Sequence, residues 1–328
     1  MGLTAILESS IMQRGLPATA GSRMLEGFVA PVDATVVERL AASGVDIVGR
    51  ADTSEFGVSG LLELTCQGDG SPDITGAVNR LLGDISKGKA DVALCNDYTG
   101  AISCAAATAG LFYVHPTYST VSRYGLIQSV ASIDQIGVIC KSAEVGFQVL
   151  KIISGYDSKD GVMPSDRVTN PDGVIVPNEA KVKRAEDLSP CSCFSSVYQQ
   201  VMQILCCAEL SNNISRYDGI KFGYRAKDYK GLDELYTKSR TEAFGEDIKL
   251  AALLGAMVLS LDNYERYYDK AMRIRRLIKE SLEFDKYDLI VTQCPLLSRL
   301  CGLPALTSPE HVFIANAGRE DVLEAKVI

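Results

Sequence analysis

Short apolar runs bounded by turn residues recur along the chain, and they predict the strands of a sheet. A run of four to eight apolar residues is typical of a strand that is buried on both faces. The segments that read as strands are residues 2–11, 45–48, 92–95 and 287–292.

Between these runs, apolar residues recur at the three- and four-residue spacing of amphipathic helices. Asp33, Ser142 and Asp262 each precede such a pattern and are candidate helix caps. Strand and helix in alternation predict an α/β protein, which we expect to form one domain over residues 1–328 around a mixed, twisted sheet. The predicted helices cover residues 36–40, 78–85, 145–152, 197–215 and 262–282.

The predicted strand 92–95 leads into a turn of the kind at which enzymes often place a catalytic residue. After the apolar run 92–95, Asn96 and Asp97 break the strand, and small residues from Gly100 onward begin a helix. Enzymes often place a nucleophile at such a turn, because free backbone N–H groups at a helix start can stabilise a developing anion. The layout is that of a catalytic turn, although Ala101 carries no reactive group.

Charge and hydropathy argue against two classes of function. The formal net charge of −8 argues against nucleic-acid binding, which needs a basic face. The longest apolar run, residues 250–261, is too short to span a bilayer, and the N-terminus lacks the pattern of a signal peptide. We therefore expect a soluble, cytoplasmic protein that does not bind a membrane.

Ten cysteines are spread over the chain without the spacing of a zinc site, and the chain has only two histidines. Most of the cysteines lie in apolar runs, where a buried free thiol is the ordinary outcome in a reducing compartment. We expect neither a metal nor a cofactor.

The sequence around the turn resembles the amidase signature family, and within it the A subunit of glutamyl-tRNA(Gln)/aspartyl-tRNA(Asn) amidotransferase. The match runs without a gap over residues 93–126, which include HPTY at 115–118 and VSRYG at 121–125. SIDQIG at 132–137 continues it, and RYDGIKFGYRAKD at 216–228 resembles the A-subunit branch in particular. The resemblance implies the family's α/β fold, trimmed at both ends.

The resemblance also assigns the family's catalytic triad, in which a lysine and a second serine activate a serine nucleophile. These positions fall on Glu8, Ala77 and Ala101. The methyl groups of the two alanines can neither attack an amide nor relay a proton, and a carboxylate replaces the ammonium group. Because loss of the nucleophile alone costs about 10⁶ in kcat, we expect the inherited hydrolysis to be absent.

Other polar residues of the matching region are candidates for the wall of the former pocket. By resemblance, Arg50 stands in place of a second lysine and Ser103 in place of an arginine. Arg123 and Asp134 are expected to brace a loop rather than bind a ligand. The candidates are Arg50, Asp97, Thr99, Gly100, Ser103, Arg123, Tyr124, Asp134 and Gln135.

Catalysis by other residues is a separate hypothesis. Glu8 and Asp97 could pair as acid and base. The ordinary roles of all these groups are structural, because small hydroxyls cap helices, a cysteine among alanines packs in a core, and an aspartate after a strand holds a turn. The possible nucleophiles are Ser9, Thr99, Ser103 and Cys104.

The resemblance fades in three segments. Residues 57–76 match only with a deletion. Residues 156–187, rich in charged residues, proline and glycine, are predicted to form a surface excursion with solvated acids and lysines. Residues 293–328 form a divergent C-terminal tail, and the sequence leaves open whether sheet edges stay uncovered there and need a second copy to cover them.

Three functions follow from these arguments. The first is a catalytically inactive homologue of the A subunit, related to tRNA-dependent amidation, that binds an amidotransferase B or C subunit or a second copy of itself. The second is a module that binds a cationic or polar small molecule in the emptied pocket. The third is an amidase or glutamine amidotransferase with relocated catalytic residues. The predicted partner surface consists of Arg216, Tyr217, Asp218, Tyr224, Arg225 and Asp228.

Overall fold

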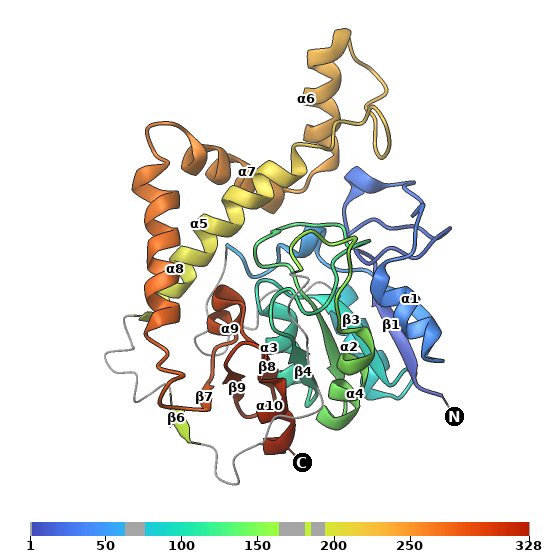
Figure 1. The fold of residues 1–328 in the computed structure, drawn as a ribbon. Helices are drawn as coiled ribbons and strands as arrows, with labels where there is room; N and C mark the ends of the chain where they lie inside the picture. Colours follow the sequence, from blue (N-terminus) through green and yellow to red (C-terminus); the bar gives the residue numbers. More distant parts are fainter. Residues whose placement is uncertain (1, 63–75, 164–180, 185–193, 328) are drawn as a thin grey trace.

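One sheet forms the centre of the protein (Figure 1). The computed structural model describes residues 2–62, 76–163, 181–184 and 194–327. Within these residues the sheet has nine strands in the order β2-β1-β3-β5-β4-β8-β9-β7-β6. The strands are β1 (Thr4–Glu8), β2 (Asp46–Ala51), β3 (Val92–Asn96), β4 (Phe112–His115), β5 (Ile136–Cys140), β6 (Val182–Arg184), β7 (Leu289–Thr292), β8 (Ala305–Thr307) and β9 (Val312–Ala315).

The strands pair in both directions, so the sheet is mixed. β1 runs parallel to β2 on one side and to β3 on the other, and their carboxyl ends therefore meet at the same end of the sheet. From β3 through β5, β4, β8 and β9 to β7 the pairing is antiparallel, and β6 is parallel to β7. The predicted α/β fold with a mixed sheet is confirmed.

Helices cover both faces of the sheet, because successive strand residues point to opposite sides. Leu7 and Leu94 face one set of helices, whereas their neighbours Ile6 and Ala93 face the other set. The amphipathic helix predicted over residues 78–85 is confirmed as part of the second set. The first set is α1 (Thr35–Ala42), α4 (Ala143–Ile153) and α10 (Glu320–Val327), and the second contains α2 (Gly76–Ser86) and α3 (Ala101–Thr108).

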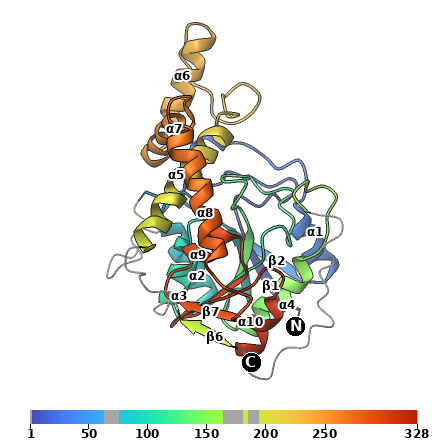
Figure 2. The same cartoon turned by 60° about the vertical axis from the view of Figure 1, so that its left-hand side comes forward.

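A group of helices extends beyond the sheet, and α6 lies at its far end in both views (Figures 1 and 2). α5 packs along α7 and also contacts α8 and α9. These elements are α5 (Phe194–Ile214), α6 (Gly231–Ala243), α7 (Glu246–Leu259), α8 (Lys270–Glu280) and α9 (Leu296–Cys301).

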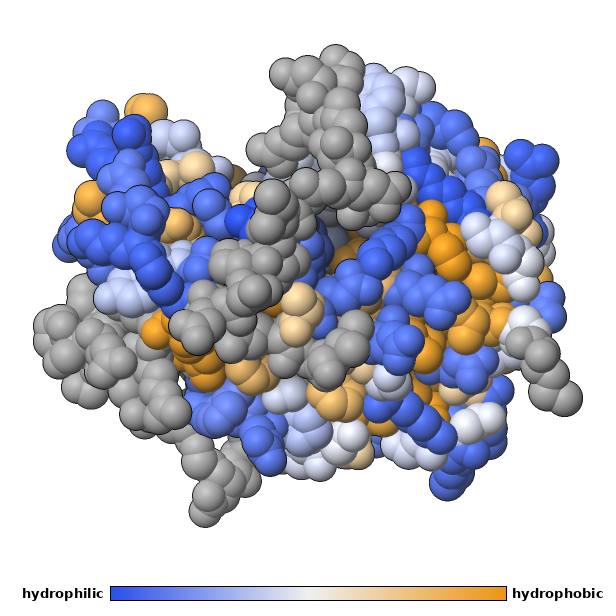
Figure 3. All heavy atoms as spheres, turned by 60° about the horizontal axis from the view of Figure 1, so that its bottom comes forward, coloured by the Kyte–Doolittle hydropathy of each residue, from blue (hydrophilic) through white to orange (hydrophobic). Residues whose placement is uncertain are grey.

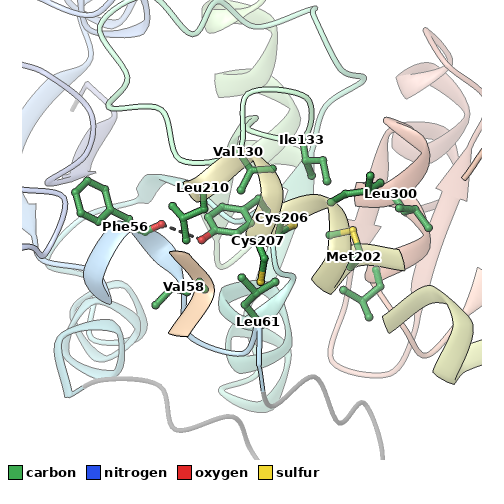
Figure 4. Packing of buried hydrophobic residues seen from close by; sticks show 14 of the residues in the cluster. Phe56, Val58, Leu61, Val130, Ile133, Met202, Cys206, Cys207, Leu210 and Leu300 are labelled. Carbon is green, nitrogen blue, oxygen red and sulfur yellow. Dashed lines mark hydrogen bonds between the residues drawn. The ribbon is translucent and has the colours of Figure 1, made fainter. Parts of the chain in front are cut away.

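The largest apolar cluster joins this helical group to the segment after β3. In Figure 4, Cys206 and Leu210 of α5 lie among side chains from neighbouring loops, including Val130. Tyr98 belongs to the same cluster, and its Oη donates a hydrogen bond to the carbonyl oxygen of Phe56 (3.0 Å). Burial of side chains of this size contributes about 1.5–3 kcal/mol each, so the cluster anchors the turn that follows β3.

The surface seen in Figure 3 carries mostly polar side chains, with apolar residues showing between them. Such a mixture is ordinary, because more than half of the accessible surface of folded proteins is apolar.

One predicted helix cap is wrong, a second has the right position without the capping hydrogen bond, and a third helix begins late. α1 has Ala34 at its N-cap, whereas Asp33 accepts a hydrogen bond from the Arg14 N–H (2.8 Å). Ser142 lies at the N-cap of α4, but its side chain makes no capping hydrogen bond. The helix expected after Asp262 starts as a π-helical turn over Glu265–Asp269 before α8.

The predicted strand 45–48 exists as β2, but it is not buried on both faces. β2 lies at one edge of the sheet and pairs only with β1 among the described strands. Val48 is consequently 52% exposed. Short apolar runs do not distinguish an edge strand from a central one, which explains this error.

The predicted surface excursion 156–187 is partly wrong, and most of it lies outside the described residues. Asp157 and Asp160 are buried rather than solvated. Asp157 accepts hydrogen bonds from the hydroxyls of Thr35 and Ser122. Burial alone raises the pKa of Asp157, but these hydrogen bonds outweigh it and leave the pKa below its ordinary value. Further along, residues 182–184 form β6.

The divergent residues 293–327 are an integral part of the fold rather than an appended tail. They supply α9, β8, β9 and α10. β8 pairs with β4, and β9 pairs with β7, so this segment occupies the middle of the sheet. The outer strands among the described residues are β2 and β6, and neither comes from this segment.

Candidate functional site

The turn after β3 has the predicted strand-turn-helix form. Gly100 takes a left-handed conformation (φ 79°) at the N-cap of α3, which begins at Ala101. Asp97 accepts hydrogen bonds from the N–H groups of Ile102 and Ser103 (both 3.0 Å), and Thr99 Oγ1 accepts one from Ala101 N–H (3.3 Å). The first three N–H groups of α3 are therefore occupied by the protein's own side chains, which corrects the expectation that they are free for an anion.

A buried arginine from the other end of the chain completes this turn. Arg299 on α9 donates from Nη2 to Asp97 Oδ2 (3.1 Å) and to Ser103 Oγ (3.0 Å), and from Nε to the Asp97 carbonyl oxygen (3.1 Å). Both charged side chains are fully buried. Ser103 Oγ itself donates to the Gly100 carbonyl oxygen (2.9 Å). Asp97 and Ser103 thus form a closed ionic network, and neither is free to act as a base or a nucleophile.

The segment before Arg299 also covers the turn. A Cβ atom at Gly100 would lie 2.8 Å from Pro295 Cγ, so α9 packs directly on the glycine. Ala101 is 7% exposed, and Thr99 is 4% exposed with its hydroxyl donating to the Ser59 carbonyl oxygen (3.0 Å). The helix start at Ala101, which the resemblance assigns to the family nucleophile, is consequently covered in this structure.

Glu8 lies at the carboxyl end of β1, next to this turn. Its Oε2 accepts a short hydrogen bond from the backbone N–H of Asn96, the last residue of β3. Burial raises the pKa of Glu8 to about 7, although the Asn96 hydrogen bond and the nearby hydroxyls of Ser10 and Thr53 oppose the rise. A carboxyl group with this pKa is partly protonated near neutral pH. Glu8 and Asp97 do not form a hydrogen-bonded acid–base pair, because each has its own partners.

Asn96 connects the turn to the loop before β5. Its Nδ2 donates to Asp134 Oδ1 (2.8 Å), and its Oδ1 accepts from the Gln135 N–H (3.1 Å). Asp134 also accepts from the N–H groups of Ser129 and Val130. Burial raises the pKa of Asp134 to about 6, against these hydrogen bonds. Gln135, Asp134 and Asn96 therefore form one structural network at the ends of β3 and β5.

Arg123 braces a loop, as predicted. Its guanidinium donates to both carboxylate oxygens of Asp160 (3.1 Å and 2.9 Å), and both side chains are almost fully buried. A further donation reaches the carbonyl oxygen of Ala131. Tyr124 lies nearby with Lys159 Nζ 5.0 Å from its ring centroid. These two pocket candidates hold residues 157–160 against the domain.

Arg50 lies on β2, the strand that pairs with β1 and Glu8, whereas Ala77 lies on helix α2. Arg50 is on β2, and its Nη2 donates to the carbonyl oxygen of Ile11 (2.8 Å). Ala77 lies in the first turn of α2, which packs against α3, β2 and β3. Glu8, Arg50 and Ala101 thus come from adjacent parallel strands or from the helix that follows one of them.

The predicted partner residues lie on the loop before α6. Tyr217 is buried with its ring 5.5 Å from that of Phe56, so it belongs to the core. Tyr224 stacks under Arg23 and donates to Glu242. The side chains of Arg216, Arg225 and Asp228 are on the exposed part of this loop, and Asp218 is half-buried.

Sequence reasoning missed Arg299, which is central to the site. The signal was present, because Arg299 interrupts the apolar run LLSRLCGL at residues 296–303. A charged residue in such a run is rarely buried unless it is paired. Its partner could not be predicted, since Asp97 lies 202 residues away in the sequence.

The described residues show neither a membrane span nor a metal cluster. None of the helices described here is long and apolar enough to cross a bilayer. In the same part of the chain, no three His, Cys, Asp or Glu side chains gather as ligands of a metal ion. Cys66, Cys191 and Cys193 lie outside the described residues.

Comparison with known proteins assigns the chain to a family. The family model described as Amidase matches residues 1–68, 85–185 and 179–298. The chain belongs to the amidase family. Among the relatives of this amidase-family protein is the A subunit of the glutamyl-tRNA(Gln) amidotransferase of Lachnoclostridium phytofermentans, with 32% identity over 364 residues that cover 96% of this chain and 72% of the relative.

Another relative of this amidase-family chain is the same protein of Wolinella succinogenes, which is 34% identical over 90% of this chain and 72% of the relative. The crystal structure of the glutamyl-tRNA(Gln) amidotransferase A subunit from Thermotoga maritima has a TM-score of 0.64 and 23% identity, covering 99% of this chain and 81% of that chain. At this identity the structural likeness shows the shared fold.

Proposed function

We propose that this amidase-family protein has no amide-hydrolysing activity and acts by binding a protein partner. The observation that carries the proposal is the chemistry of the turn after β3: Ala101 offers no nucleophile, and Glu8 supplies a carboxyl group where the family resemblance expects an ammonium base. The burial of Asp97 and Ser103 in an ionic network with Arg299 supports the same conclusion.

The candidate partner is another component of a tRNA-dependent amidotransferase, because the relatives are named as the A subunit of such an enzyme. The exposed residues Arg216, Arg225 and Asp228 form the proposed contact surface. The segment that carries them is held on the domain by Tyr217, which stacks on Phe56, so its shape is fixed before a partner binds.

A second exposed surface lies on α7 and offers a comparison. Leu250, Leu253 and Met257 are 47%, 70% and 44% exposed, and their spacing places them on one face of the helix. Exposed apolar residues grouped on one face often mark interaction sites. This face lies on a different helix from the proposed contact surface, so the two can be altered separately.

Hydrolysis assays test the first half of the proposal. We expect purified protein to release no ammonia from glutamine or from simple amides above the buffer rate. Glu8→Gln removes one of the two acidic groups considered as a relocated acid and base, the other being Asp97, which is paired with Arg299, and it should give the same result. Activity in the wild type that is lost in Glu8→Gln would contradict the proposal and favour relocated catalysis.

Affinity capture tests the second half. We expect the tagged protein to retain purified amidotransferase B or C subunit, and we expect the double variant Arg225→Ala/Asp228→Ala to weaken retention at least tenfold. The matched control is Arg276→Ala/Glu280→Ala, an exposed charge pair on α8, which should retain the partner normally. If the wild type binds neither the B subunit nor the C subunit, the proposal is rejected.

A further inference from the structure

Unpartnered polar groups are concentrated around Glu8. Among the described residues, seven buried side-chain nitrogen or oxygen atoms lack a hydrogen-bond partner. Ser9 Oγ, Ser10 Oγ, Thr53 Oγ1 and Arg50 Nη1 account for four of them, and all belong to residues close to Glu8 in the sequence or on the neighbouring strand. A buried polar atom without a partner destabilises a folded protein, so a group of four is expected to have an occupant.

Several contacts show that these residues lie close together around Glu8. Ser10 and Thr53 lie near enough to the Glu8 carboxyl group to lower its pKa, although neither completes a hydrogen bond with it. The Ser9 N–H donates to the Ala51 carbonyl oxygen (2.7 Å), which links the end of β1 to β2. Arg50 Nη2 is engaged by backbone carbonyl oxygens, so Nη1 of the same guanidinium is held beside the cluster.

The cluster lies where α/β proteins bind ligands. β2, β1 and β3 are parallel, and Ala51, Glu8 and Asn96 are their last residues. Ligands of α/β sheets bind outside the carboxyl ends of parallel strands. Ser9, Ser10 and Thr53 directly follow these ends and are each at least nine-tenths buried.

The chemistry of the cluster selects the kind of occupant. Glu8 offers carboxylate oxygens, and the three hydroxyl groups can accept hydrogen bonds, so the cluster is rich in acceptors. The neighbouring carboxylate of Asp97 is neutralised by Arg299, whereas Glu8 forms no ion pair among the described residues. An anion would be repelled by Glu8, and among the described residues no three His, Cys, Asp or Glu side chains gather here to ligate a metal ion. A small cation that donates several hydrogen bonds matches both the charge and the acceptors.

We propose that the Glu8 cluster is a binding site for a small primary ammonium group, held by the Glu8 carboxylate and the hydroxyls of Ser10 and Thr53. The site goes beyond partner binding and does not depend on it. Failure to capture a protein partner therefore leaves the ammonium site untouched, and failure to bind ammonium leaves the partner proposal untouched.

The site has a defined dependence on pH. The cation needs ionised Glu8, so binding strengthens as the pH rises through about 7 and then levels off. The charged neighbours are Asp97, which favours protonation of Glu8, and Arg50, which interacts attractively with Glu8. The other titratable neighbours, the Cys95 thiol and the phenols of Tyr98 and Tyr113, have pKa values raised well above their ordinary range by burial and stay neutral.

Thermal unfolding of the whole chain at pH 8 tests the proposal. Ammonium chloride and methylammonium chloride should raise the unfolding midpoint by about 3 °C in a saturable way, and isothermal titration should show one site. Tetramethylammonium chloride carries the same charge without N–H donors and should have no more effect than sodium chloride at equal ionic strength. Equal responses to all four salts overturn the proposal.

Two variants and one spectroscopic readout complete the test. Glu8→Gln should abolish the saturable response, and Thr53→Val should weaken binding about tenfold. The matched control Thr307→Val removes another unpartnered buried hydroxyl, on β8, and should bind normally. In ¹³C-carboxyl NMR, ammonium should lower the pKa of Glu8 but not that of Asp134. A response that persists in Glu8→Gln rejects the site.

Discussion

At the scale of single residues, the site depends on one charge that comes from a distant part of the chain. Asp97 is fully buried, and among the described residues its only ion-pair partner is Arg299. By resemblance the family has an arginine at position 103, where this chain has a serine, and the Arg299 guanidinium donates to that serine hydroxyl. Asp97 therefore has a buried cationic partner that is supplied by α9.

Replacement of Arg299 should be strongly destabilising. Arg299→Leu leaves Asp97 buried without a counter-charge, so we expect the free energy of unfolding to fall by about 3–5 kcal/mol in urea titrations at pH 7. Asp97→Asn in the same chain should recover part of the loss. The control Arg276→Leu breaks an exposed pair with Glu280 and should change stability by less than about 1 kcal/mol. Equal losses in the two single variants would contradict a buried ion pair.

Glu8 should make stability depend on pH. Its pKa is about 7 in the folded protein and 4.5 ordinarily, so between these values the folded state holds a proton that the unfolded state has lost. The free energy of unfolding should therefore fall by about 3 kcal/mol as the pH rises from 4.5 to 7. Glu8→Gln should lack this fall, which a difference between the two unfolding curves measured at each pH would reveal. Parallel curves would show that Glu8 titrates normally.

The sequence predicted which residues occupy the turn but not how they pair. Motif matching assigns Ala101 from the ungapped match over residues 93–126 and Glu8 from the match of the N-terminal strand, and both assignments stay predictions. The partners of Asp97 and Asp160 come from segments that are distant in the sequence. Periodicity and motif spacing describe only local patterns, so they cannot predict these partners. The same limit explains why Asp157 and Asp160 were expected to be solvated.

At the scale of elements, local patterns identified helices and strands well but not their environment. The helical spacing over residues 78–85 predicted α2 and its buried face correctly. The apolar run 45–48 predicted a strand but not its position at an edge, because edge position is a property of the whole sheet. Residues 293–327 diverge in sequence from the family, yet they supply β8, which pairs with β4.

A close backbone contact should make the loop before α6 sensitive to a single methyl group. Gly223 has φ 82°, and a Cβ atom there would overlap the Met24 carbonyl oxygen, which accepts a hydrogen bond from the Tyr224 N–H. Gly223→Ala should therefore cost about 3 kcal/mol of unfolding free energy and expose residues 216–230 to limited proteolysis.

Gly110→Ala is the matched control for this change. Gly110 also has a positive φ (74°), but a Cβ atom there meets nothing within 4 Å. This variant should cost only the backbone strain, about 1–2 kcal/mol, without new proteolysis in residues 216–230. If the two variants behave alike, the contact with Met24 is not what holds the loop.

At the scale of the whole molecule, stability should be uneven. α5 is buried along much of its length, whereas α6 buries only Leu235, Ser239 and Ala243. Local opening should therefore be easier in α6 than in α5 or in the central strand β3. We expect amide hydrogen exchange in α6 to be at least tenfold faster than in β3 under native conditions. Equal protection would indicate that α6 unfolds only together with the sheet.

The span between Asp97 and Arg299 also sets an order of events during synthesis. A nascent chain that has emerged from the ribosome as far as α8 already contains β1, β3 and the whole of α3, yet it has no cation to place beside Asp97. This carboxylate stays hydrated until α9 follows, so the interior around the turn closes only after Arg299 has been translated. The turn after β3 is therefore among the last of the described regions from which water is excluded.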